Sequence, residues 1–85
     1  MQTTHKLTPA GQSLVASFID YHAQFPSKHN PRAWVRYVER MRQSAPPWQS
    51  VVLKIPADMT ASGRVESITI YQTLFEPQAS HATNH

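Results

Sequence analysis

Apolar side chains recur with helical spacing in two segments of the first half of the chain. In the first, Thr8 precedes Pro9, a pair typical of a helix start, because Thr caps free N–H groups and proline lacks one. The apolar positions that follow share one side of a helical wheel: Ala10, Leu14, Val15, Phe18, Ile19, Tyr21, His22 and Phe25. This pattern predicts an amphipathic helix over residues 8–25.

The second helical segment starts in the same way, with Asn30 as the cap and Pro31 at the first position. Its apolar positions, Trp34, Tyr37, Val38 and Met41, cluster within about 100° of the wheel. The proline pair that follows Ala45 cannot continue a helix, so we expect the helix to span residues 30–43. Because Phe18, Trp34 and Tyr37 recur at the helical period, we predict that they form the core between the helices. A base-stacking platform is the alternative for these aromatic side chains.

Beyond the proline pair the period changes to two. Val51, Leu53 and Ile55 alternate with Val52 and Lys54, which predicts a strand over residues 50–55. A second alternating segment rich in Thr, Ile, Tyr and Val predicts a strand over residues 65–75, with the even-numbered positions on one face. The link 57–64 is longer than an ordinary hairpin loop, so we expect it to project.

These elements predict a small α+β domain. A helical hairpin (residues 8–25 and 30–43) packs on an antiparallel β-hairpin (residues 50–55 and 65–75), in the order helix, helix, strand, strand. Residues 1–7 are expected to form a flexible lead-in, 8–76 a single domain and 77–85 a disordered tail. A two-stranded sheet is marginal by itself and its longer strand would leave an open edge, so we expect a homodimer.

Composition narrows the functional classes. The chain has 85 residues, enough for one domain, and no cysteine, which excludes disulfides and thiolate metal sites and suits a cytoplasmic location. No apolar run approaches the roughly 20 residues that span a bilayer, so we expect no membrane partner. The five histidines lack metal-ligand spacing, and we predict no metal and no cofactor. Scattered carboxylates and only two glycines argue against an enzyme.

Positive charge is concentrated in one window. Five of the eight basic residues lie between Lys28 and Arg42 beside a single acid, Glu39, for a local charge of +4, and the rest of the chain carries −1. Arg32, Arg36 and Arg40 are spaced four apart, so on a helix each advances by only about 40° and the three form a stripe. Glu39 can pair with Arg36 or with Arg42 across one turn.

The basic helix indicates an anionic partner. Our leading prediction is a non-enzymatic accessory or regulatory protein whose basic helix contacts the phosphates of DNA or RNA. The residues expected to bind are Arg32, Arg36, Arg40 and Arg42, with peripheral support from Lys28 and Arg64. The first alternative is a protein-interaction module or inhibitor that binds an acidic protein surface, and the second is a solvated face with no partner. For Trp48 we favour a plug at the end of the core, with a partner anchor as the alternative.

Overall fold

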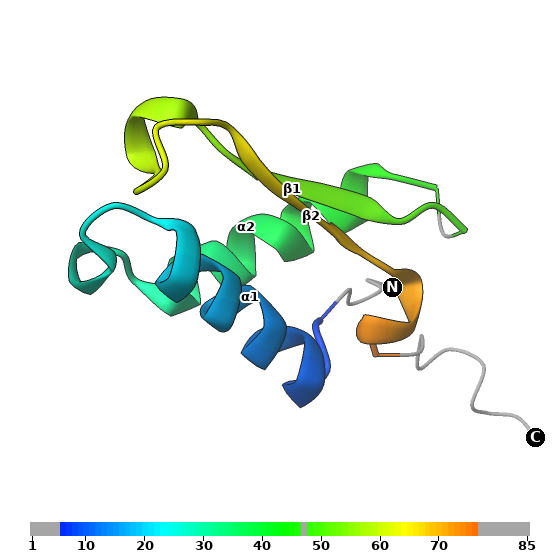
Figure 1. The fold of residues 1–85 in the computed structure, drawn as a ribbon. Helices are drawn as coiled ribbons and strands as arrows, with labels where there is room; N and C mark the ends of the chain where they lie inside the picture. Colours follow the sequence, from blue (N-terminus) through cyan, green and yellow to red (C-terminus); the bar gives the residue numbers. More distant parts are fainter. Residues whose placement is uncertain (1–5, 47, 77–85) are drawn as a thin grey trace, which may run out of the picture.

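Two helices pack on one face of a two-stranded antiparallel sheet (Figure 1). The computed structural model describes residues 6–46 and 48–76. Its elements are α1 (Pro9–His22), α2 (Pro31–Ser44), β1 (Val51–Ile55) and β2 (Glu66–Ile70), with short 3-10 turns at Pro26–Lys28, Ala57–Met59 and Gln72–Leu74. The predicted α+β fold and its element order are confirmed. The flexible start and the tail fall largely on residues 1–5 and 77–85, which lie outside the described residues.

Both helices start where the caps predict. The Thr8 hydroxyl accepts a hydrogen bond from the Gly11 N–H at 3.0 Å, and the Asn30 side chain accepts one from the Arg32 N–H at 2.9 Å. However, α1 ends at His22, three residues before the expected end. The chain becomes extended at Ala23, where it forms an isolated bridge with Thr60, and the Gln24 N–H donates to the Met59 carbonyl. Pairing with the loop that follows β1 therefore replaces the last turn of the predicted helix.

The sheet is held in a register that runs from Val51 opposite Ile70 to Ile55 opposite Glu66. Val51, Leu53 and Ile55 are buried against the helices, as the alternation predicts. The second strand, however, ends at Ile70 rather than at residue 75. A 3-10 turn over Gln72–Leu74 follows the strand, and Phe75, directly after this turn, is buried in the core. The second strand is therefore as long as the first, and not longer as predicted.

The segment before α1 pairs with the segment after β2, and together they cover one end of the core. Phe75 forms an isolated bridge with Leu7, and the Glu76 N–H donates to the Lys6 carbonyl at 2.7 Å. Leu7, which falls in the expected lead-in, is fully buried, so the packed domain begins before Thr8. The buried apolar side chains form one cluster: Leu7, Val15, Phe18, Ile19, Ala23, Val38, Val51, Leu53, Ile55, Ile70 and Phe75.

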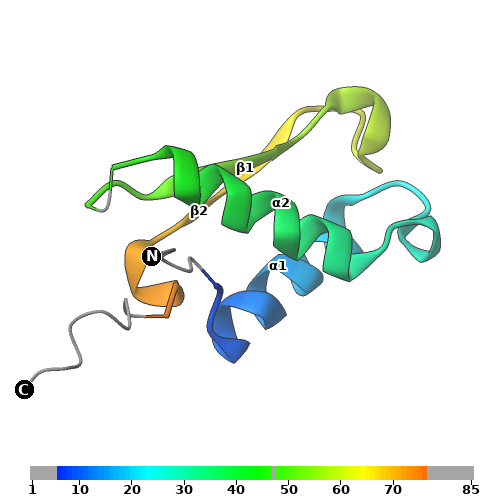
Figure 2. The ribbon, with the colours of Figure 1, turned by 180° about the vertical axis from the view of Figure 1, so that it is seen from behind.

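The helices divide the inner face of the sheet between them. α1 packs beneath β2 and α2 beneath β1, and both views show the two helices side by side under the hairpin (Figure 1 and Figure 2). One long side of α2 is therefore turned away from the core. No helix among residues 6–46 and 48–76 is long and apolar enough to cross a bilayer.

Candidate functional site

Three arginines lie exposed along the outer side of α2. Arg32, Arg36 and Arg40 occupy successive turns, opposite the buried Val38, and we call these three residues the arginine ridge. At 1.5 Å per residue the ridge extends about 12 Å along the helix axis. None of the three guanidinium groups forms an ion pair within the described parts of the chain. The ridge therefore presents positive charge to solvent.

Glu39, the one acidic side chain of α2, does not pair with an arginine as expected. Its carboxylate accepts a hydrogen bond from the Leu7 N–H at 2.8 Å. This contact joins α2 to the segment before α1 and turns the carboxylate toward the space between the helices. Glu39 therefore does not occupy the N–H donors of the ridge arginines, although its negative charge still lowers the local net charge.

Arg42 was predicted to bind the anionic partner, and its position contradicts that prediction. Only 4% of the residue's surface is exposed. Its guanidinium donates to the Gln49 carbonyl and, at 2.9 Å, to the Pro46 carbonyl, and it lies 5.6 Å from the centre of the Phe75 ring. Arg42 therefore ties the link after α2 to the core, and the Pro46 carbonyl also accepts a hydrogen bond from the Gln49 N–H at 3.0 Å. The exposed positive charge of α2 comes from three arginines and not four.

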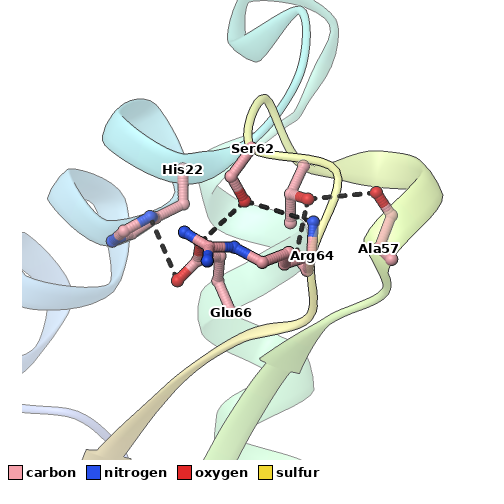
Figure 3. Close-up of polar contacts among 6 residues, drawn as sticks. His22, Ala57, Ser62, Arg64 and Glu66 are labelled. Atoms are coloured by element: carbon pink, nitrogen blue, oxygen red, sulfur yellow. Dashed lines mark hydrogen bonds and ion pairs between the residues drawn. The ribbon is translucent and has the colours of Figure 1, made fainter.

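Lys28 and Arg64 lie on other segments than the ridge. Lys28 is exposed on the 3-10 turn between the helices, with its ammonium 5.2 Å from the centre of the Phe25 ring. Arg64 is exposed on the loop between β1 and β2, beside Ser62 and Glu66 (Figure 3). The structure therefore does not merge all the predicted basic residues into one continuous surface.

The loop that carries Arg64 was expected to project, but it folds against the end of α1. The Ala61 N–H donates to the His22 carbonyl at 2.8 Å. Glu66 accepts a hydrogen bond from the Ser62 hydroxyl at 2.7 Å, and its carboxylate lies 3.7 Å from the His22 ring nitrogen (Figure 3). The buried Thr60 hydroxyl lies 2.7 Å from the Arg64 carbonyl. The contacts with His22 hold the loop against the end of α1.

Hollows lie on both flanks of the ridge. The one between α1 and α2 has a volume of about 600 Å³, within the range of ligand sites, and Lys6, Arg32, Arg36 and Glu39 contribute to its walls. The other lies between α2 and β1, has a volume of about 360 Å³, and is lined by Ala33, Trp34, Tyr37, Lys54, Pro56 and Met59. We call it the aromatic hollow. Sequence reasoning did not single out Lys6 or Lys54, because neither belongs to the basic window and only the fold brings them beside α2.

Two of the aromatic residues predicted to lie in the core, Trp34 and Tyr37, line the aromatic hollow instead. Phe18 is buried as expected, but Trp34 is only partly buried and 42% of Tyr37 is exposed. The Trp34 and Tyr37 rings meet edge to face with their centres 6.0 Å apart. Because β1 lies above only one side of α2, these rings form a wall that solvent reaches. They are available to a ligand in a way that a core pair is not.

Trp48 does not plug the core, because 74% of the residue's surface is exposed. Three other large apolar residues are also exposed. Val52 lies on the outer face of the sheet, and Val65 and Tyr71 lie at the two ends of β2. The hypothesis that Trp48 anchors a partner stays a prediction.

The described residues contain no group of three or more His, Asp or Glu side chains placed to hold a metal ion. Of the histidines in the sequence, His5, His81 and His85 lie outside the described residues. No protein-family model, no curated protein and no solved structure matches the chain. The inference of function therefore depends on the geometry given above.

Proposed function

We propose that this protein is a non-enzymatic accessory or regulatory protein that binds nucleic-acid phosphates through the arginine ridge. The observation that supports the proposal is the set of three exposed guanidinium groups on successive turns of α2, free of ion pairs in the described residues. Their span of about 12 Å equals the axial rise of three to four nucleotides of a B-form strand. Arginine suits this role because its planar fork donates two hydrogen bonds to one phosphate.

Lys6 extends the same surface. It borders the hollow between α1 and α2 together with Arg32 and Arg36, so a strand along the ridge passes close to a fourth positive charge. Lys28 and Arg64 belong to other segments and contribute less. Because contacts of this kind go to phosphates, binding depends strongly on salt and weakly on base sequence, and both DNA and RNA qualify as partners.

The proposal is tested with two double variants that remove equal charge from different places. Fluorescence anisotropy measures binding of a labelled random-sequence duplex and of the matching single strand at low and moderate salt. The first variant, Arg36→Gln with Arg40→Gln, removes two ridge charges, and the second, Lys28→Gln with Arg64→Gln, removes two charges elsewhere. We expect the ridge variant to lose about tenfold or more in affinity and the control variant about threefold or less, because each lost phosphate contact weakens binding.

Two results contradict the proposal. The first is the absence of binding by the wild-type protein to either probe at low salt. The second is an equal loss in both double variants, which would attribute the affinity to net charge and not to the ridge.

A second candidate function is that of an interaction module or inhibitor that binds an acidic surface of a larger protein. The exposure of Trp48, Val65 and Tyr71 favours it, because exposed large apolar side chains mark interaction sites. We also propose a cytoplasmic homodimer. In the described residues each strand of the sheet has a main-chain partner on one side only, which leaves two edges for a second copy. Sedimentation velocity at several concentrations tests the dimer, and a monomer at all of them contradicts it.

A further inference from the structure

We infer that the aromatic hollow and the adjacent edge of β1 form a second binding site, for an extended acidic segment of another protein. This site lies on the opposite flank of α2 from the hollow between the two helices. It borders the arginine ridge only at Arg40 and does not depend on nucleic-acid binding.

The first observation is the open edge of β1. β1 pairs with β2 on one side, and no main-chain group of Val51–Ile55 bonds to any other part of the described chain. An extended peptide can therefore add as a third strand, with main-chain hydrogen bonds that require no particular peptide sequence. A two-stranded sheet gains stability from such a strand.

The second observation is the position of the hollow beside that edge. Its walls come from Ala33, Trp34 and Tyr37 of α2 and from Lys54 of β1, with Pro56 and Met59 just beyond the strand. No residue of β2 contributes to the walls, so the hollow lies on the unpaired side of β1. Every second side chain of an added strand would point toward this hollow, because side chains alternate along a strand. A volume of about 360 Å³ with an aromatic wall accepts an apolar side chain.

Charge defines the rest of the partner. Lys54 borders the hollow and is exposed, and Arg40 lies beside Tyr37 on the next turn of α2, where both line a further hollow of about 350 Å³. None of the wall residues of the aromatic hollow carries a carboxylate. A strand whose apolar residues alternate with Asp or Glu therefore matches the surface in both shape and charge.

The main-chain edge favours a peptide over a nucleobase as the occupant. A base could stack on Tyr37, but it would leave the unpaired N–H and C=O groups of β1 unused. A peptide strand satisfies both the edge and the hollow.

An array of hexapeptides that alternate Glu with one apolar residue (Leu, Ile, Val, Met, Phe, Tyr or Trp) tests the site. Two variants of equal charge change are compared, Lys54→Glu beside the hollow and Lys28→Glu on the turn between the helices, both at exposed positions. We expect at least one peptide to bind the wild-type protein, Lys54→Glu to weaken it about 5- to 30-fold, and Lys28→Glu to change it by less than about twofold. Tyr37→Ser is expected to weaken the same peptide.

Strand addition has its own control. The best peptide is made in two forms, with N-methyl groups on its odd or on its even residues. Only one set of amides faces β1, so one form should lose at least tenfold in affinity and the other should bind like the parent peptide. Equal effects of the two forms would show that the peptide does not add to the sheet, and would overturn the inference.

Three further results would also overturn it. The first is that no peptide of the array binds the wild-type protein. The second is a single-stranded oligonucleotide that loses affinity in Tyr37→Ser while no peptide binds, which would assign the hollow to a base. The third is a dimer that Tyr37→Ser dissociates in the absence of peptide binding, which would assign it to a second copy of the chain. Circular dichroism melting of each variant establishes that the fold is intact.

Discussion

Replacing Arg42 by methionine removes the one charged side chain that is buried among the described residues. Methionine retains an unbranched apolar stem of similar length, so the substitution mainly deletes the guanidinium. The change therefore isolates the hydrogen bonds to the Gln49 and Pro46 carbonyls and the contact with the Phe75 ring.

The magnitude follows from these three contacts. Each hydrogen bond from a charged group contributes about 1.5–3 kcal/mol, and a guanidinium beside an aromatic ring about 0.5–2 kcal/mol. The carbonyls are only partly buried and water can reach them after the change, so the low end of each range applies. Arg42→Met should lower the free energy of unfolding by about 3–4 kcal/mol. That is a large part of the roughly 4–13 kcal/mol expected for a chain of 85 residues.

Thermal and urea unfolding followed by circular dichroism measure this loss, with Arg40→Met as the matched control on the exposed side of the same helix. For a domain of this size, 3–4 kcal/mol corresponds to a melting temperature lower by roughly 12–30 °C. The control should stay within about 0.5 kcal/mol of the wild type. Nucleic-acid binding should show the reverse order, with Arg40→Met weakened and Arg42→Met unchanged at temperatures where it is folded. If Arg42→Met melts like the wild type, or loses as much affinity as the control, the reasoning is refuted.

Three further substitutions test other contacts. Gly11→Ala should lower the melting temperature by about 4–8 °C instead of raising it as in an open helix, because the new Cβ would lie 2.6 Å from the Leu74 carbonyl oxygen; a rise would show that the chain does not pack there. Thr60→Val should cost about 1–2 kcal/mol in urea unfolding and expose the loop to proteolysis, because it removes a buried hydroxyl that lies within hydrogen-bond distance of the Ala57 and Arg64 carbonyls, and wild-type resistance to protease would contradict the docked loop. Glu39→Gln keeps an acceptor for the Leu7 N–H and removes one negative charge from α2, so duplex affinity at low salt should rise about two- to fivefold in anisotropy titrations, and a decrease would argue against the ridge.

The helix starts and the inner face of β1 were predictable because their signals are local. Thr8 and Asn30 cap the helices through contacts within three residues, and the alternation of β1 is complete within its own five residues. The position of each signal in the sequence is close to the position of its effect in the structure.

The burial of Arg42 had a local signal, because Arg42 follows the buried Val38 by four residues and therefore lies only about 40° from it on the helix. The sequence does not reveal its hydrogen-bond partners, because these are carbonyls of the irregular link after α2. The end of β2 has a similar cause. The period-two pattern continues past Ile70, but β1 begins at Val51, directly opposite it, so later residues have no strand to pair with and Phe75 meets Leu7 instead.

The aromatic hollow also depends on tertiary structure. The helical period of Trp34 and Tyr37 indicates an apolar side of α2 but not how far β1 covers that side. Lys54 reaches the hollow only because the strand crosses above the helix. Among the predicted anion-binding residues, the ridge kept its arrangement since helical spacing alone determines it.

The salt dependence of duplex binding tests the central claim most directly. The slope of log K against log salt falls by about 0.9 for each phosphate contact, so a protein that uses the ridge should lose about two to three units of slope in the Arg32→Gln, Arg36→Gln, Arg40→Gln triple variant. Anisotropy titrations between about 20 and 200 mM salt resolve a change of this size. We predict a triple-variant slope shallower by that amount with an unchanged melting temperature. A slope equal to that of the wild type would contradict the assignment of phosphate binding to this face of α2.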